Sequence, residues 1–169
     1  MPISTRENST SLRAGVARRV VRLRQLNRSQ YRLLFEAAFV LAIAKAAIIF
    51  VPFRRIAPEL GTAMAESAGA VSTTQAKTAA EVAWALKAWG RRAGLLRQCL
   101  AQAIAAQWML RRRGLGSTLY LGVRKNSSAT LDAHAWLRFG SRILVGGETR
   151  SGFQVVAKFG YIPASVPTS

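Results

Sequence analysis

The chain of 169 residues carries 25 Lys and Arg against seven Asp and Glu, a formal net charge of +18. Such an excess predicts attraction to something anionic: nucleic acid, a membrane, an acidic protein or an acidic peptide. One cysteine excludes a disulfide framework and is typical of a reducing compartment, so we expect a cytoplasmic protein. One cysteine and one histidine cannot build a common zinc site, and we expect neither metal nor cofactor. The length suggests a single domain, 1–169.

The first 32 residues are the most basic part of the chain. After a polar start, arginines alternate with Val and Leu from Leu12 to Arg32, a pattern that predicts a basic amphipathic helix. Its arginines either form a solvated face or dock an acidic partner or a lipid, with Arg18, Arg22 and Arg28 as the partner-binding candidates. Aromatic interleaving and nucleic-acid motifs are absent from this stretch, so we expect no nucleic-acid partner.

The next stretch is the hydrophobic maximum of the sequence. Tyr31–Val51 predicts a helix long enough to span a bilayer, and Pro52 ends it. Glu36 and Lys45 lie within it, and charges are costly inside a membrane. A buried core helix is therefore the preferred interpretation, with a membrane anchor as the alternative.

A third helix follows a stretch of small residues, 61–72, that predicts a loop. Ser72 and Gln75 have the spacing of a capping box, which places a helix start there. We expect this helix to end near Trp89 and to bury the apolar face Ala79, Val82, Ala83 and Leu86.

The only cysteine, Cys99, precedes the next helical pattern. Leu100–Leu110 repeats apolar residues at helical spacing, and Gly114 ends the pattern after three arginines. If the helix begins at Cys99, the positive end of its dipole favours the thiolate, which is the nucleophilic form. The plainer interpretation is a small buried thiol.

Beyond Gly116 the pattern changes to alternation with a period of two. It predicts an antiparallel sheet with Gly140–Ser141 as a hairpin turn, from strands 118–123, 133–139, 142–145 and 153–159. Helices followed by a short antiparallel sheet indicate an α+β fold. One cysteine at a helix start, Cys99, and one histidine on a later strand, His134, are the minimal layout of a papain- or transglutaminase-type nucleophile. We therefore expect a helical region 1–70, a papain- or transglutaminase-like core 71–160 and a loose tail 161–169.

The only histidine, His134, lies on the second predicted strand. Alternation places His134 and Trp136 on one face of that strand, and we expect this face to meet Cys99. His134 would then take the thiol proton and later protonate a leaving amine. Trp136 would shield the pair from water or pack in the core. A lone histidine is otherwise an ordinary core or surface residue.

Four short motifs, taken in order, resemble one family. They are Cys99-Leu100-x-Gln102-Ala103, Met109–Gly114, Leu121–Lys125 and Ala133–Leu137. Together they resemble the transglutaminase-like leader peptidases of lasso-peptide biosynthesis, over roughly residues 70–160.

The resemblance implies a bacterial cysteine endopeptidase that removes the leader from a ribosomally made precursor peptide. It also implies two further partners: a small leader-recognition protein, and a separate ATP-dependent cyclase that closes the ring. Residues 1–70 predict no run of strands, so the chain resembles the stand-alone protease.

The third member of a catalytic triad is the open question. The family usually has an acidic residue on the strand after the histidine, and the closest matching position here is Gly146, which cannot supply one. Depending on the hairpin register, either Gly147 or Glu148 lies opposite His134. Glu148 is the first choice, Asp132 the second, and a backbone carbonyl remains open. For the oxyanion we expect the Cys99 N–H, with Gln98 as the side-chain candidate.

Two other functions fit the same residues. The first is another transglutaminase-fold enzyme that makes or breaks amide bonds through a thioester on Cys99. The second is a non-catalytic, basic, membrane-associated adaptor, for which Cys99→Ala would have no consequence.

Overall fold

The computed structural model describes residues 26–90, 95–126 and 130–163, without the side chains of 95–98 and Thr149. The chain divides into two units, Met1–Arg32 and Leu33–Ser169. The predicted basic helix falls almost wholly outside the described residues, and Arg18 and Arg22 with it.

The described end of the first unit holds a capping box. The Asn27 side chain accepts a hydrogen bond from the Gln30 N–H at 2.8 Å, and the Gln30 side chain accepts one from the Asn27 N–H at 3.0 Å. This box starts α2 (Arg28–Phe50), whose bounds are close to the predicted Tyr31–Val51. The prediction of one basic helix through Arg32 is therefore wrong at its end, because Asn27 caps a new helix and Arg28 lies in its first turn.

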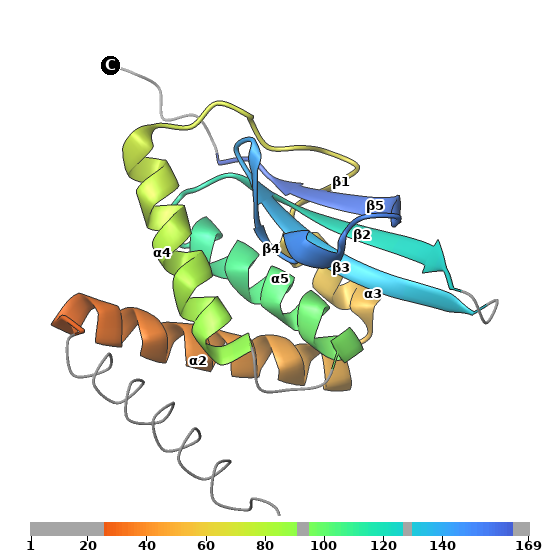
Figure 1. Ribbon diagram of the computed structural model, residues 1–169, viewed down its shortest axis with the longest axis horizontal. Helices are drawn as coiled ribbons and strands as arrows, with labels where there is room; N and C mark the ends of the chain where they lie inside the picture. Colours follow the sequence, from red (N-terminus) through yellow and green to blue (C-terminus); the bar gives the residue numbers. More distant parts are fainter. Residues whose placement is uncertain (1–25, 91–94, 127–129, 164–169) are drawn as a thin grey trace, which may run out of the picture. The chain divides into compact units, whose positions relative to one another are not determined.

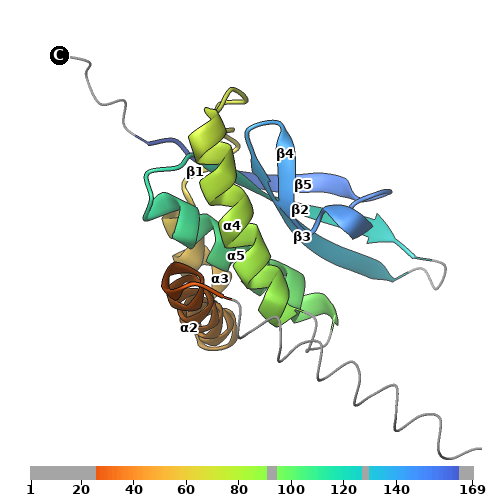
Figure 2. The ribbon, with the colours of Figure 1, turned by 60° about the vertical axis from the view of Figure 1, so that its left-hand side comes forward.

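The second unit has a helical layer and a sheet layer, and the α+β prediction is confirmed (Figures 1 and 2). Three long helices form the helical layer, namely the rest of α2, α4 (Thr73–Gly90) and α5 (Leu95–Arg111). The sheet has the order β1-β5-β2-β3-β4, with the strands β1 (Thr62–Ala63), β2 (Ser117–Lys125), β3 (Leu131–Phe139), β4 (Arg142–Val145) and β5 (Gln154–Tyr161). The second unit also contains three short helical segments, namely α3 (Phe53–Ile56), η1 (Ala57–Leu60) and η2 (Gly147–Thr149).

The core lies between the two layers. Leu119 pairs with Leu137 on β3 and with Phe159 on β5, and all three side chains are buried. The Phe53 ring of α3 meets the Phe159 ring edge-on at 5.8 Å, so this face of the sheet is the one turned toward the helices. From α5, the buried Gln107 side chain donates a hydrogen bond to the Phe159 carbonyl at 3.0 Å. α5 is therefore attached to the sheet by packing and by hydrogen bonding.

Local sequence signals place the other helices. Ser72 and Gln75 form the predicted capping box, with hydrogen bonds of 2.9 and 3.2 Å. The predicted face of α4 is buried, consisting of Ala79, Val82, Ala83 and Leu86. The segment 61–72 is not only a loop, as predicted, because Thr62–Ala63 forms β1 against β5. Gly61 allows this close pairing, since its backbone has φ +111° and lies against the Gly160 carbonyl.

The hairpin between β3 and β4 decides what lies beside His134. Its turn is the predicted Gly140–Ser141, with Phe139 opposite Arg142. A bulge then shifts the register by one residue, so that Leu137 lies opposite Val145. Continued further, this shifted register would set Glu148 opposite His134. The strand instead ends at Val145, and Gly146 turns the chain out of the sheet with φ +76°.

Candidate active site

Cys99 is the fifth residue of α5, in the second turn of the helix, and is half-buried. The prediction that Cys99 begins the helix is wrong, because α5 begins at Leu95. No Ser, Thr, Asp or Asn stands before Leu95 to mark that start. An N–H in the second turn bonds to the carbonyl four residues earlier, so the Cys99 N–H is not among the open donors of the first turn. The effect of the dipole also weakens beyond that turn.

His134 lies on β3, half-buried, and its ring is held by the main chain. Its Nε2 is 2.8 Å from the carbonyl oxygen of Gly146. A carbonyl only accepts hydrogen bonds, so Nε2 is the donor and carries the proton. In a neutral imidazole with that tautomer, Nδ1 is the basic nitrogen. Gly146 is also the position at which the sequence resemblance leads us to expect an acid.

The two acidic candidates are engaged elsewhere. Glu148 lies on η2 with its side chain 90% exposed, 3.8 Å from the Lys87 ammonium of α4. Asp132 accepts hydrogen bonds from Arg124 at 3.3 Å and from the Asn126 amide at 3.2 Å. The sequence left three candidates for the group that contacts His134, namely Glu148, Asp132 and a backbone carbonyl. In the structure the group that contacts the His134 Nε2 is the backbone carbonyl of Gly146.

No other residue type at position 146 fits this geometry without movement. A Cβ on Gly146 would lie 2.4 Å from the Ala135 carbonyl oxygen and 3.0 Å from the Trp136 Cα. The backbone is also left-handed there, which disfavours any side chain. The same turn that brings the carbonyl to His134 therefore excludes an acidic side chain at this position.

His134 lies in a row of aromatic side chains on the sheet face away from α3. The Trp136 ring stacks on Tyr120 at 5.7 Å and lies 5.9 Å from the His134 ring. On the other side, the Phe153 ring is 5.2 Å from His134, and the Arg124 guanidinium covers Phe153 at 4.4 Å. Trp136 is buried, and Gly122 makes room for it, since a Cβ there would lie 2.8 Å from the indole. Packing on both sides fixes the plane of the imidazole.

The edge of β3 is where the helical layer approaches His134. β4 pairs with β3 only at Leu137–Phe139, and beyond that point Gly146 and η2 run along this edge. η2 reaches α4 through Glu148 and Lys87, and α5 packs on β3. In both ribbon views the N-terminal end of α5 lies toward η2 rather than toward the β3–β4 turn (Figures 1 and 2). The N-terminal end of α5, which carries Cys99, thus lies toward the same edge of β3 as Gly146 and η2, whereas the His134 side chain lies on the sheet face away from α3.

The profile of the transglutaminase-like superfamily matches residues 41–158. The chain belongs to that superfamily. The matched segment runs from within α2 to β5 and includes both Cys99 and His134. The chain matches none of the curated proteins and none of the solved structures. The transglutaminase-like superfamily generally carries cysteine-based catalysis, and it includes cysteine proteases and amide-bond enzymes.

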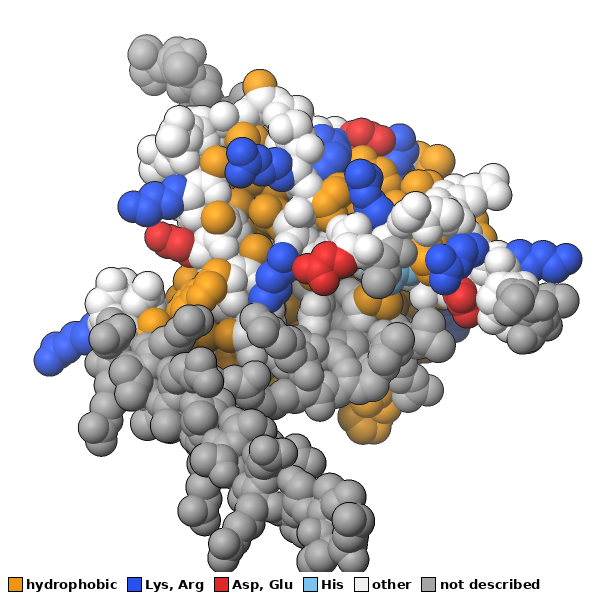
Figure 3. Space-filling model, viewed as in Figure 1, with side chains coloured by type: hydrophobic (Ala, Val, Ile, Leu, Met, Phe, Trp, Pro, Cys, Tyr) orange, Lys and Arg blue, Asp and Glu red, His pale blue; other side chains and the backbone are white. Residues whose placement is uncertain are grey.

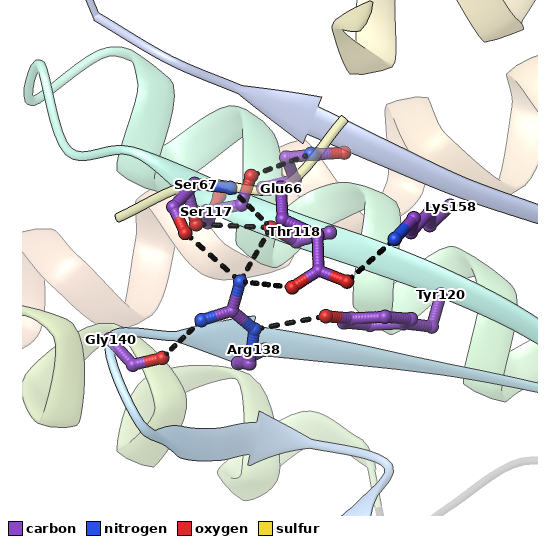
Figure 4. Close-up of polar contacts among 9 residues, drawn as sticks. Glu66, Ser67, Ser117, Thr118, Tyr120, Arg138, Gly140 and Lys158 are labelled. Atoms are coloured by element: carbon purple, nitrogen blue, oxygen red, sulfur yellow. Dashed lines mark hydrogen bonds and ion pairs between the residues drawn. The ribbon is translucent and has the colours of Figure 1, made fainter. Parts of the chain in front are cut away.

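A polar network continues the aromatic row of His134 and Trp136 in this transglutaminase-like chain. The sequence did not predict this network. Figure 4 shows the Arg138 guanidinium between β2, β3 and the segment that contains Glu66 and Ser67. It donates hydrogen bonds to Tyr120 Oη at 3.0 Å, to the Gly140 carbonyl at 2.6 Å, to the Ser67 carbonyl at 3.0 Å and to Glu66 at 3.1 Å. The sign of this network in the sequence was Arg138, which lies on the same face of a mostly apolar strand as His134.

Glu66 joins the network to β5. Its second oxygen accepts a hydrogen bond from Lys158 at 2.8 Å. This bond, followed by the charges of Lys158 and Arg138 and by a hydrogen bond from Tyr120, outweighs desolvation and lowers the pKa of Glu66. The network fixes Tyr120, against which Trp136 and then His134 are stacked.

The remaining predicted residues lie outside this arrangement. The Gln98 side chain falls outside the described residues, so its oxyanion role stays a prediction. Arg28 is exposed in the first turn of α2. Within 26–90, 95–126 and 130–163, no three His, Cys, Asp or Glu side chains gather as metal ligands.

Proposed function

We propose that the chain is a cysteine endopeptidase that removes the leader from a lasso-peptide precursor. The superfamily supports cysteine chemistry, and the four motifs around Cys99 and His134 support this branch of it. The observation that carries the proposal is the hydrogen bond between His134 Nε2 and the Gly146 carbonyl. It sets the tautomer in which Nδ1 can take a proton from a thiol.

The reaction follows from that tautomer. His134 accepts the Cys99 thiol proton, and the thiolate attacks the carbonyl of the last leader residue. The peptide C–N bond breaks, the imidazolium protonates the leaving amine of the core peptide, and the leader stays on Cys99 as a thioester. A water molecule deprotonated by His134 then hydrolyses the thioester and frees the leader.

The test is leader release by the purified chain in the presence of precursor and leader-recognition protein, followed by mass spectrometry. Cys99→Ala and Cys99→Ser should abolish release. His134→Phe keeps a ring in the aromatic row but has no nitrogen, so it should also abolish release with an unchanged circular dichroism spectrum. Normal release by any of these variants contradicts the proposal. Alkylation by iodoacetamide offers a second check, because the single thiol gives a single adduct.

The proposed partner dependence rests on the basic stretch at the N-terminus. Surface charge of this kind accelerates encounter with an acidic partner and is screened by salt. The leader-recognition protein should therefore raise the cleavage rate, and added salt should reduce that gain. Charge reversal at Arg18, Arg22 and Arg28 should weaken the gain and leave the rate without partner unchanged. A full rate without partner, or a normal partner response in the reversed variant, contradicts this role.

A further inference from the structure

α2 buries one face and exposes another that is just as apolar. Leu34, Ala37, Val40, Leu41 and Ala44 are buried within the second unit. On the opposite side, Phe35 is 71% exposed, Phe39 67% and Phe50 81%. At about 100° per residue, positions 35, 39 and 50 lie within one narrow sector of the helix. Ile43 and Ile49, also exposed, border that sector. Exposed apolar faces of this kind mark interaction sites.

No acidic side chain lies within this exposed sector of α2. Glu36, at its border, forms ion pairs with Arg113 at 2.6 Å and Arg112 at 3.7 Å. The hydrogen bond from Arg113 and the charges of both arginines outweigh desolvation and lower the pKa of Glu36, which stays ionised and paired. The carboxylate at the border of the exposed phenylalanines is thereby paired with two arginines.

Cations surround the same face. A groove beside α2 is lined by Phe39 and Ile43 from the helix, and by Trp108, Arg111 and Arg112 from α5 or just beyond it. Glu59 also lines the groove, and its carboxylate is paired with Arg111 at 3.6 Å. Arg54 and Arg55, just beyond the C-terminal end of α2, are exposed. On the face of the molecule that Figure 3 draws, Lys and Arg side chains are spread over the described surface. The surroundings therefore complement an anionic surface.

We propose that the exposed face of α2 docks on an anionic lipid surface. α2 would lie in the interface, with its phenylalanines among the acyl chains and the nearby arginines at the headgroups. Phe and Ile on one side, with cations at the border, fit the pattern of such helices, which carry large apolar side chains on one face and Lys or Arg beside them.

Two other occupants fit the observations less well. α2 is the helix among the described ranges that is long and apolar enough to span a bilayer. Spanning, however, would remove its buried face from α4 and α5, including the Trp89 hydrogen bond to the Leu34 carbonyl and the Glu36–Arg113 pair. A second copy of the chain would bring the same cations to the interface, at a net charge of +18 on each copy.

The test is sedimentation of the full chain with vesicles of phosphatidylcholine alone or mixed with phosphatidylglycerol. The wild-type chain should bind the mixed vesicles. Phe35→Ser with Phe39→Ser should weaken binding by about tenfold or more, because two phenyl rings no longer leave water. Val155→Ser with Val156→Ser is the matched control, since both valines are exposed on β5, and it should bind normally. The basic N-terminus is present in both variants, so the difference between them reports on α2.

Charge and depth give independent readouts. Arg54→Glu with Arg55→Glu should weaken binding to the mixed vesicles, whereas Arg142→Glu with Lys125→Glu should weaken it less. Brominated lipids should quench the fluorescence of Trp108, which lines the groove. Trp108→Phe should remove that quenching, and Trp84→Phe on α4 should retain it.

Several results would overturn the proposal. One is that the wild-type chain does not bind the mixed vesicles. Another is that the variant with Phe35→Ser and Phe39→Ser binds as well as its control. A third is that the chain stays with the membrane after salt and carbonate washing, which indicates a spanning helix. Self-association without lipid that Phe35→Ser with Phe39→Ser abolishes would assign the face to a second copy. If the double variant misfolds, Phe50→Ser replaces it, because that ring is 81% exposed and its loss leaves the core intact.

Discussion

The Nε2 atom of His134 lies 2.8 Å from the carbonyl oxygen of Gly146, the residue at which the sequence resemblance leads us to expect an acid. Gly146→Ala tests this contact. The new Cβ would meet the Ala135 carbonyl, so the turn must move and the Gly146 carbonyl must leave the imidazole. We expect leader release to fall by about tenfold or more, since a poorly oriented base loses much of its effect. The measurement is the initial rate of release, together with the thermal midpoint.

Gly152→Ala is the control for the backbone cost. Gly152 has φ +80°, similar to +76° at Gly146, and both alanines therefore cost about 1 kcal/mol of stability. At Gly152 the new Cβ comes no closer than 3.4 Å to the Arg124 side chain. It should leave the rate of release nearly unchanged. Equal losses of rate in the two variants would show that only stability was affected.

The acidic side chains beside His134 should be dispensable for the chemistry. Glu148→Gln removes a charge that is 90% exposed and is paired with Lys87 at the surface, so its rate should stay within about twofold of the wild type. Asp132→Asn keeps one acceptor oxygen, for either Arg124 or Asn126, and should behave similarly. A loss of about a hundredfold in either variant, of the size expected for an essential acid or base, would restore that residue to the triad.

Elements with local signals were predictable from the sequence. The capping box of Ser72 and Gln75 gave the start of α4 almost to the residue, and Gly140–Ser141 gave the β3–β4 turn. The start of α5 has no such signal, because Leu95 and Leu96 follow a glycine without a capping side chain. Alternation along β3 likewise placed His134 with Trp136 on one face.

The hydrogen-bond partner of His134 was not predictable, because it depends on two non-local features. A bulge in β4 shifts the register after the turn, and a left-handed residue then ends the strand. Ile143-Leu144-Val145 is apolar throughout and carries no sign of the bulge. The one clue in the sequence was Gly146 in place of the expected acid. It indicated a hydrogen bond from His134 to the backbone only once the turn was known.

Gly122→Ala should disturb the aromatic row that holds the imidazole. Gly122 lies opposite His134 in the β2–β3 register, and a Cβ there would lie 2.8 Å from the Trp136 ring. We expect a loss of about 1–3 kcal/mol in the free energy of unfolding, the usual cost of overpacking, and a slower release of leader. Trp136→Phe in the Gly122→Ala background removes the larger ring and should recover part of both losses. No recovery in that double variant would contradict the steric explanation.

The pair between Glu36 and Arg113 should make stability depend on pH. The hydrogen bond from Arg113 lowers the pKa of Glu36 from its usual value of 4.5, so the folded state favours the carboxylate more than the unfolded state does. The resulting stabilisation is complete above the unfolded pKa and is lost as the pH falls through the lower, folded pKa. Glu36→Gln should therefore reduce the free energy of unfolding by about 1–2 kcal/mol at neutral pH, since both side chains are largely buried.

The difference between wild type and Glu36→Gln should shrink as the pH falls below about 4, because the wild-type carboxyl then also becomes neutral. Urea denaturation at a series of pH values measures it. Glu59→Gln is the matched control, since Glu59 is 69% exposed and its carboxylate is 3.6 Å from Arg111. It should change stability by less than about 0.5 kcal/mol at any pH. A loss in Glu36→Gln that does not vary with pH would mean that packing, and not the charge of Glu36, holds this part of α2 against α5.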